Sequence, residues 1–237
     1  MPDEYLKTRG LNFSYQTPRQ RPRDFILSPV PSRAMLNSVI ALHKAIKPRK
    51  PIMIHPWPVV HSSKSSYRIF NLRTDRAVSP RTGQSHDFYI LESAPWVNII
   101  PITPEEEVVF IRQYRHGIQE STLEIPGGLV ESFDDPESAA LRELKEETGY
   151  EGQDIHYLGK VHPNPAIQNN ECHSFVAWNV KKTGLQDLDA KEDIETTLFP
   201  LSTVPEMIFN GQITHSLVLC AFFYFFSANR PDLMFTG

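Results

Sequence analysis

Cysteine and long apolar runs are scarce in this chain of 237 residues. The two cysteines, Cys172 and Cys220, are too few for a disulfide framework, so a reducing, cytoplasmic location is expected. No stretch reaches the roughly 18 consecutive apolar residues of a membrane span. The most apolar segment, LVLCAFFYFF at 217–226, predicts a buried helix instead. The first residues, MPDEYLKTRG, lack the apolar core of a secretory signal, and no membrane partner is expected.

Basic residues are concentrated at the start of the chain, whereas the rest is acidic. The first 50 residues hold ten Lys and Arg against three Asp and Glu, a balance of +7, and the net charge of −4 leaves −11 for the remainder. Residues 1–52 are therefore interpreted as a basic, proline-rich N-terminal extension, partly disordered, with one possible helix at 32–46. The extension lacks the interleaved aromatic residues of single-strand-binding proteins, so nucleic acid is not an expected partner.

Residues 53–237 form the predicted folded domain, in which short β-branched and aromatic segments alternate with turn residues. No internal repeat is present. The pattern predicts an α/β fold with a mixed sheet flanked by helices. Strands are expected at 66–73, 87–92, 96–102, 106–115, 122–125, 155–161, 172–180 and 194–199, and helices near 204–210 and 214–226.

A glycine turn followed by a capped helix occupies residues 128–150, GLVESFDDPESAALRELKEETGY. The glycines at its start let the backbone approach a ligand closely or adopt positive φ. Asp134 and Asp135 offer N-cap side chains, and Pro136 suits the first helical turn. No residue breaks the helix before Gly149, which stands where a C-terminal stop is expected.

Three glutamates of this helix, Glu143, Glu146 and Glu147, fall within an arc of roughly 100°. Their charges repel one another. A hard cation such as Mg²⁺ offsets that repulsion, because it takes carboxylate oxygens and completes its shell with waters and substrate phosphates. Arg142 can pair with Glu146 at i,i+4 and hold its carboxylate in place. From helix spacing alone, a solvated acidic face that binds no metal is an equally good interpretation.

The order of residues in this stretch resembles the signature of the Nudix hydrolases, G-x5-E-x7-R-E-U-x-E-E-x-G-U, where U is a bulky apolar residue. The matching positions are Gly128, Arg142, Glu143, Leu144, Glu146, Glu147, Gly149 and Tyr150. Asp134 stands where the family carries glutamate, a carboxylate one methylene longer. The resemblance covers about residues 57–227 and implies an α/β/α sandwich with a mixed sheet and a catalytic loop–helix–loop motif.

Two features outside this stretch resemble the ADP-ribose pyrophosphatase branch of that family. Pro165 lies sixteen residues after Gly149, a spacing typical of the branch. The segment VVFIRQYRHG, followed by LEIPGG, is also similar, and the resemblance implies that Arg115 holds the substrate's phosphates and Glu124 lines the pocket near the metals. The alternatives are an ordinary turn proline and an exposed charge at a strand end.

The sequence departs from that branch at the position of the general base. Several members carry a glutamate in the loop after the proline, but counting from Pro165 that position is Asn170, and an amide cannot act as a base. Either Glu171 reaches the site, or water beside the metal is deprotonated with help from Glu146. The acidic run KEDIE at 191–195 is interpreted as a solvated loop, with an approach of one carboxylate to the metals as the alternative.

The resemblance implies a Mg²⁺-dependent enzyme, with Mn²⁺ as a possible substitute, that hydrolyses the pyrophosphate of a nucleoside diphosphate linked to another group. ADP-ribose, cleaved to AMP and ribose 5-phosphate, is the expected small-molecule substrate. Metal ligands would be Glu143, Glu146, Glu147 and the Gly127 carbonyl, with Arg142 orienting the glutamates. The alternatives are another nucleotide sugar, a dinucleoside polyphosphate, or a ligand-sensing module without catalysis. Close relatives in the branch are usually homodimers, and a homodimer is expected.

Overall fold

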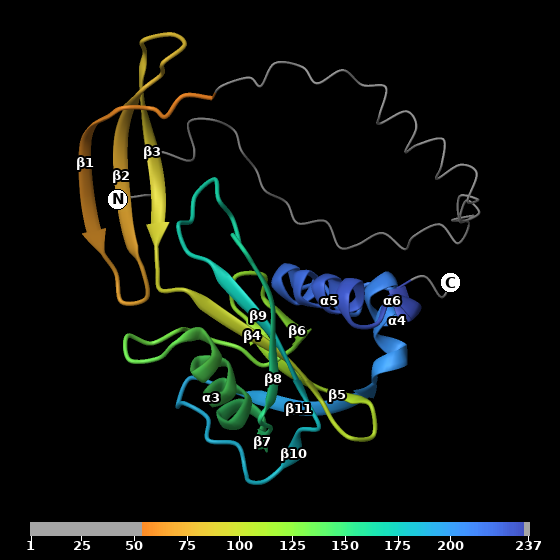
Figure 1. Cartoon of the computed structure of the whole chain (residues 1–237). Helices are drawn as coiled ribbons and strands as arrows, with labels where there is room; N and C mark the ends of the chain where they lie inside the picture. The colour runs from red at the N-terminus through yellow and green to blue at the C-terminus, as the bar shows by residue number, and fades with distance from the viewer. Residues whose placement is uncertain (1–53, 235–237) are drawn as a thin grey trace, which may run out of the picture. The chain divides into compact units, whose positions relative to one another are not determined.

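A computed structural model describes residues 54–234 of the chain (Figure 1). Contacts between residues divide the chain into two units, Met1–Ile54 and His55–Gly237. The predicted N-terminal extension, with its possible helix at 32–46, lies outside the described residues.

A mixed six-stranded sheet forms the centre of the second unit (Figure 1). Its strand order is β11-β5-β4-β9-β8, and β6 pairs with β5 beyond that path. The pairing of β4 with β9 is parallel, whereas the other pairings in this sheet are antiparallel. The bounds are β4 Trp96–Ile102, β5 Glu107–Arg115, β6 Glu120–Glu124, β8 Asp154–Val161, β9 Cys172–Trp178 and β11 Ile194–Pro200.

Helices cover both faces of this sheet because its strands are apolar on both sides. One buried cluster joins Ile99 of β4 to Ala140 and Leu144 of α3, Pro136–Thr148. The other joins Ile100 to Phe222 of α5, Ser216–Ala228. Three short elements flank α5 in the chain: η1 (Leu201–Thr203) and α4 (Val204–Phe209) precede it, and α6 (Pro231–Met234) follows it. The predicted α/β/α sandwich with a mixed sheet is therefore confirmed.

Helix α3 begins and ends at the residues that the sequence indicates. Asp135 is the N-cap, and its side chain accepts hydrogen bonds from the backbone N–H groups of Glu137 and Ser138. Gly149 takes the left-handed conformation, φ 72°, and its N–H donates to the Lys145 carbonyl. These two caps set the ends of the helix, and the packing of Ala140 and Leu144 against Ile99 of β4 holds it on the sheet.

A separate antiparallel sheet precedes the central one and consists of β1 (Val59–Ser66), β2 (Asn71–Val78) and β3 (Ser85–Glu92). The predicted strand at 66–73 is wrong, because β1 ends at Ser66 and a turn separates it from β2. The turn is closed by a hydrogen bond of 2.9 Å from the Tyr67 N–H to the Phe70 carbonyl. The strand was not predicted because residues 59–66 are mostly small and polar and are exposed throughout. Two-residue strands β7 (Tyr150–Glu151) and β10 (Lys181–Lys182) pair with each other and were not predicted either.

The apolar segment near the C-terminus is a helix, as predicted, and its observed bounds are those of α5. Its buried face carries Val218, Ala221, Phe222, Phe225 and Phe226. Within residues 54–234, no helix combines the length and the apolar character needed to span a membrane.

Candidate active site

Two carboxylates of α3 are buried against the glycine turn. Glu147 is 3% exposed, and its Oε2 accepts a hydrogen bond of 2.9 Å from the backbone N–H of Gly127. Glu143 lies beside Gly128, where an added Cβ would come within 2.4 Å of its Oε1. At Gly127 an added Cβ would come within 2.3 Å of the Val97 carbonyl oxygen. Both glycines are therefore required by close packing between the turn, strand β4 and the helix.

Burial makes this pair of carboxylates costly to ionise. Burial raises the pKa of Glu147 to about 8, against the opposing hydrogen bond from Gly127 and with further repulsion from Glu143 and Glu192. Burial likewise raises the pKa of Glu143, although Arg142 opposes the shift. An environment that disfavours two adjacent negative charges is one in which a bound cation gains stability, because it removes that repulsion.

Arg142 donates hydrogen bonds to three acidic side chains of the site. Its Nη1 donates to Glu143 Oε1 and to Glu146 Oε2, both at 2.9 Å. Its Nε donates to Asp134 Oδ2 at 3.0 Å, and its Nη2 donates to the Leu129 carbonyl at 3.1 Å. The expected i,i+4 pair with Glu146 is present. Asp134, which departs from the family signature, reaches the arginine despite its shorter side chain.

The donor set suits a hard divalent cation that is completed by its ligand. Within the described residues, no three His, Cys, Asp or Glu side chains form a ready-made metal cage. Glu146 is half-exposed and, like one oxygen of Glu143, is engaged by Arg142. The buried carboxylates of Glu143 and Glu147, with the carbonyl of Gly127, remain as oxygen donors. Mg²⁺ commonly uses one or two carboxylates and takes waters and substrate phosphates for the rest, so the residues present fit it.

Arg115 and Glu124 form a bidentate ion pair beside these carboxylates. Arg115 Nε and Nη2 donate to the two oxygens of Glu124, each at 2.7 Å, and the Thr122 hydroxyl donates to Glu124 Oε1 at 2.5 Å. Burial opposes ionisation of Glu124, but these donors outweigh it and hold its pKa below its usual range. The Arg115 side chain remains 41% exposed, so its guanidinium can also meet an anion from solvent.

A cavity of about 300 Å³ opens next to this ion pair. Arg115 and Glu124 line one part of it, and the backbone of Gly127 and Gly128 forms part of its wall. Most of the other lining residues come from the start of β4, from β9 and from the N-terminal turn of α5 with the residue before it, and two come from the loop that contains the glycine turn. The cavity therefore adjoins the turn that contacts the glutamates of α3. The remaining lining residues are Trp96, Val97, Asn98, Ile125, Leu129, Cys172, His215, Leu217 and Val218.

The loop between β8 and β9 carries Pro165, Asn170 and Glu171. Pro165 is exposed in a turn closed by a hydrogen bond from the Ile167 N–H to the Asn164 carbonyl. It thus fits the alternative of an ordinary turn proline. Asn170 is 4% exposed, and neither atom of its amide has a partner among the described residues.

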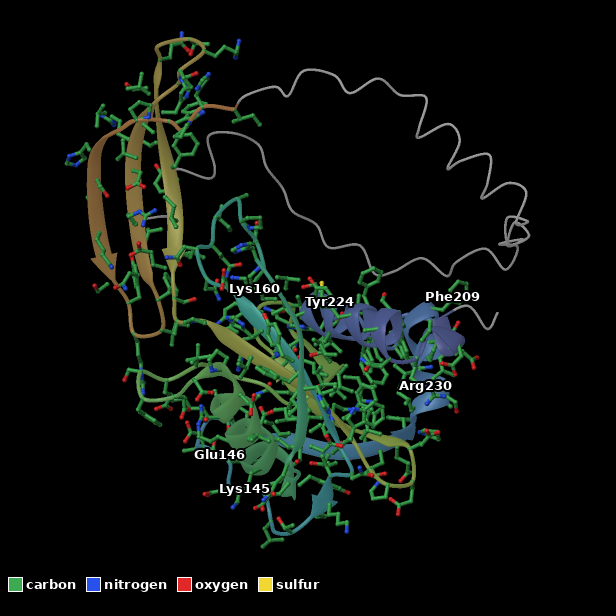
Figure 2. The ribbon with its side chains drawn as sticks, in the orientation of Figure 1. Lys145, Glu146, Lys160, Phe209, Tyr224 and Arg230 are labelled. Atoms are coloured by element: carbon green, nitrogen blue, oxygen red, sulfur yellow. The ribbon has the colours of Figure 1, made fainter. Side chains whose placement is uncertain are left out.

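Glu171 is held in a basic cluster. Its Oε1 lies 2.7 Å from Lys160 Nζ and 4.0 Å from His162 Nε2, and its Oε2 lies 3.5 Å from His173 Nε2. The bond to Lys160 lowers the pKa of Glu171. Figure 2 shows Lys160 beside the strands and Glu146 on α3, well separated in that view. The structure thus brings together Arg142, Glu143, Glu146 and Glu147, and places Arg115 and Glu124 next to them, but it holds Glu171 with Lys160.

Comparison with known proteins identifies the family. The model of the NUDIX domain matches residues 93–220, more than half of the chain. The chain belongs to the NUDIX family. The matched region contains the glycine turn, α3 and most of the central sheet, so the signature helix lies within the Nudix fold.

Known proteins similar to this Nudix chain include several hydrolases of ADP compounds. It is 32% identical to a methanol dehydrogenase activator of Bacillus methanolicus over 67% of this chain and 86% of the relative. It is 30% identical to an ADP-ribose pyrophosphatase of Bacillus subtilis over 43% of this chain and 57% of that protein. A crystal structure of an ADP compounds hydrolase superposes with a TM-score of 0.66 at 20% identity, covering 76% of this chain and all of the other. The predicted resemblance to the ADP-ribose pyrophosphatase branch, and to Nudix pyrophosphohydrolases, is confirmed.

The acidic loop before β11 approaches the Nudix helix more closely than its sequence indicates. Gln186 Nε2 donates to the Glu147 carbonyl at 2.6 Å, and the Asp187 N–H donates to the Glu146 carbonyl at 2.8 Å. This loop brings the negative charge of Glu192 close enough to raise the pKa of both Glu143 and Glu147. From the sequence, a solvated loop was the simpler interpretation, because the spacing of residues does not reveal the hydrogen bonds of Gln186.

Proposed function

We propose that this Nudix protein hydrolyses the pyrophosphate bond of a nucleoside diphosphate linked to another group, with Mg²⁺ as cofactor and Mn²⁺ as a substitute. ADP-ribose is the proposed substrate, with AMP and ribose 5-phosphate as products. The observation that carries the proposal is the buried pair Glu143 and Glu147 against the Gly127–Gly128 turn, with Arg115 beside it. The names of relatives that act on ADP-ribose and ADP-sugars support the substrate class.

Each residue of the site has a proposed part in this reaction. Glu143, Glu147 and the Gly127 carbonyl would hold the cation, which would neutralise charge on the diphosphate and lower the pKa of nearby water. Glu146 is the third acidic group available to this site. Arg142 keeps the glutamates in place through its four hydrogen bonds. Arg115 binds a phosphate through its Nη1 and the exposed edge of its guanidinium, because Nε and Nη2 already donate to Glu124.

Hydrolysis forms one bond and breaks one. The oxygen of water bonds to one phosphorus, and the bridging oxygen leaves with the other phosphate. One water proton passes to Glu146, and the leaving phosphate takes up a proton from solvent. Both proposed bases are ion-paired, Glu146 with Arg142 at 2.9 Å and Glu171 with Lys160 at 2.7 Å. Glu146 is favoured because it lies on α3 beside the proposed cation ligands Glu143 and Glu147, whereas Glu171 lies in the loop before β9. Glu171 as the base would require that ion pair to open.

The direct test is a substrate panel with the purified protein and Mg²⁺. ADP-ribose, other nucleotide sugars and diadenosine polyphosphates are incubated separately, and a coupled phosphatase releases phosphate from the products but not from the intact substrates. Selective turnover of ADP-ribose is expected. Turnover of another member instead would keep the hydrolase and replace its substrate. A folded protein that turns over no member would leave a ligand-sensing module as the better account.

A homodimer is part of the proposal, with the β1–β3 sheet at its interface. Every residue of β1 is exposed, and Val59, Val60, Phe88 and Tyr89 are large apolar side chains left open to solvent on this sheet. A sheet with this much exposed apolar surface is stabilised when it packs against another surface, here that of a second copy of the chain. Sedimentation of the wild type and of Val60→Asp tests this, and a wild type that sediments as a monomer would refute it. A cytoplasmic location is also proposed, because two cysteines are too few for a disulfide framework, and both Cys172 and Cys220 are free thiols.

A further inference from the structure

The last turn of α3 carries Glu146 and Glu147, and its backbone carbonyls depend on partners outside the helix. The last four C=O groups of an α-helix have no N–H of a following turn to accept from. Here the Asp187 N–H donates to the Glu146 carbonyl at 2.8 Å, and Gln186 Nε2 donates to the Glu147 carbonyl at 2.6 Å. The carbonyls of both glutamates are therefore held by the loop before β11.

The side-chain amide of Gln186 joins this turn to the central sheet. Besides the Glu147 carbonyl, its Nε2 donates to the Ile194 carbonyl at 3.1 Å. An amide nitrogen has two protons, so both are used. Ile194 is buried and is the first residue of β11, which pairs with β5. The end of α3 is thus attached to a strand of the sheet, and not only to a loop.

The turn that Gln186 holds is the one from which the Glu147 side chain reaches the glycine turn. Glu147 Oε2 accepts from the Gly127 N–H at 2.9 Å, a contact that a small shift of the helix end would lengthen. Glu143 lies one turn earlier, where each carbonyl meets the N–H four residues further on. The position of Glu147 therefore depends on Gln186 more than the position of Glu143 does.

We propose that Gln186 is a positioning residue of this Nudix site, whose amide fixes the last turn of α3 to β11 and so holds the Glu147 carboxylate at the glycine turn. Its importance for the reaction rests on the proposed function, in which Glu147 holds the cation. Gln186 acts through the backbone of Glu147 and takes no part in the chemical step. Partners that orient metal ligands in this indirect way typically change metal affinity about 10- to 100-fold when they are removed.

The hydrogen bond between Gly127 and Glu147 provides a direct readout of this role. Gln186→Met keeps the length of the side chain and removes the donor. In the full chain, the amide proton of Gly127, observed by heteronuclear NMR, should move to lower chemical shift in Gln186→Met because its bond to the carboxylate lengthens. The matched control is Asp135→Ala, which removes the cap at the opposite end of the same helix. In that variant the Gly127 resonance should keep its wild-type position.

Binding of Mn²⁺ alone gives a second readout that needs no turnover. The concentration of free Mn²⁺ is followed by its electron paramagnetic resonance signal at a temperature where all variants are folded. The dissociation constant should rise about 10-fold in Gln186→Met and stay at the wild-type value in Asp135→Ala. In assays with ADP-ribose, the Mg²⁺ concentration for half-maximal rate should rise by the same factor, while the KM for ADP-ribose stays unchanged.

Two results would overturn the positioning role. One is a folded Gln186→Met with the wild-type Gly127 resonance and wild-type Mn²⁺ affinity. The other is an equal change in Gln186→Met and Asp135→Ala, which would show that the stability of the helix alone is responsible. Should Gln186→Met fail to fold, Gln186→Asn decides, because it keeps the amide but shortens its reach by one methylene. Wild-type values of both readouts in Gln186→Asn would overturn the role.

Other results separate this role from the proposed function. A shifted Gly127 resonance with wild-type Mn²⁺ affinity would keep Gln186 as the residue that positions Glu147 and overturn Glu147 as a cation ligand. Both expected changes in a protein that turns over no substrate would keep the positioning role and overturn the proposed hydrolysis.

Discussion

Glu147 Oε2 and the backbone N–H of Gly127 are joined by a hydrogen bond of 2.9 Å that ties the signature helix to the glycine turn. The two residues are twenty positions apart in sequence and belong to different elements. The bond leaves the second oxygen of Glu147 for a cation and aligns the turn with the helix. The hydrogen bond between Glu147 and Gly127 thus contributes both to the packing of the fold and to the proposed metal site. Variants of Glu147 should distinguish these two roles, because loss of packing lowers stability whereas loss of the metal site lowers turnover.

Glu147→Gln should lower kcat for the proposed hydrolysis by at least about 10³-fold, since an amide keeps the shape but loses the charge that holds the cation. The fold should persist, and the melting temperature of the metal-free protein near neutral pH should change little, because burial raises the pKa of Glu147 to about 8 and the amide therefore replaces a largely uncharged carboxyl. Steady-state kinetics and thermal unfolding measure both. Glu137→Gln is the matched control, an exposed glutamate of the same helix. A rate within threefold of the wild type for Glu147→Gln would contradict the site assignment.

The metal-free protein should lose stability as the pH rises through the pKa of Glu147, about 8. The folded state holds this proton up to a higher pH than the unfolded chain, where the usual value near 4.5 applies. Its contribution is therefore complete below about pH 4.5 and is lost between there and pH 8–9. Urea unfolding in EDTA should show a free energy of unfolding lower by about 2–3 kcal/mol at pH 9 than at pH 6. Glu147→Gln should remove most of this slope, and a slope unchanged in the variant would refute the link to Glu147.

Gly128→Ala should damage the site through direct collision with a carboxylate. The new methyl group would lie 2.4 Å from Glu143 Oε1, so that side chain must move away from the turn. We expect weaker Mg²⁺ dependence, with a several-fold higher Mg²⁺ concentration for half-maximal rate, and a modest loss of stability. Gly184→Ala is the control, since no atom lies within 4 Å of its added Cβ and Gly184 is outside the site. Equal Mg²⁺ profiles for both variants would show that Glu143 does not hold the metal.

Local sequence patterns predicted the central elements of the fold, because helix caps and glycine turns depend on residues only a few positions apart. The Asp135 and Gly149 caps of α3 and the Arg142–Glu146 pair were foreseen, since i,i+3 and i,i+4 neighbours meet in any α-helix. Runs rich in β-branched and aromatic residues, bounded by turn residues, also predicted β4 and β9 nearly to their ends. Features that depend on residues close together in the sequence could therefore be predicted from it.

Contacts between distant segments could not be predicted in this way. The hydrogen bonds of Gln186 to the end of α3 and of Asn98 to α5 join residues 39 and 119 positions apart, and neither has a periodic signal. The first strand, β1, was missed because its serines and exposed faces do not alternate between core and solvent. The fate of Glu171 was equally hidden, because its partner Lys160 comes from the neighbouring strand.

Glu146→Gln and Glu171→Gln should differ in their effect on turnover. Glu146 is adjacent to the proposed cation ligands, so its amide variant should lower kcat by about 10²-fold or more, the range typical of a lost general base. Glu171 is engaged with Lys160, and its amide variant should change kcat less than about threefold. Turnover rates at saturating substrate and Mg²⁺ decide the matter. The reverse order, with Glu171→Gln the more damaging, would show that the ion pair with Lys160 opens during the reaction.

The adjacent aspartates Asp134 and Asp135 should have separable roles. Asp135 caps α3 through two backbone N–H groups, so Asp135→Ala should lower the free energy of unfolding by about 1 kcal/mol. Asp134 instead accepts from Arg142 Nε at 3.0 Å, so Asp134→Ala should loosen the arginine that holds the glutamates and lower kcat several-fold with less effect on stability. Asp134→Glu, which restores the family's residue, should keep the wild-type rate. Urea unfolding and kinetics on all three variants test the separation, and a larger loss of kcat in Asp135→Ala than in Asp134→Ala would contradict it.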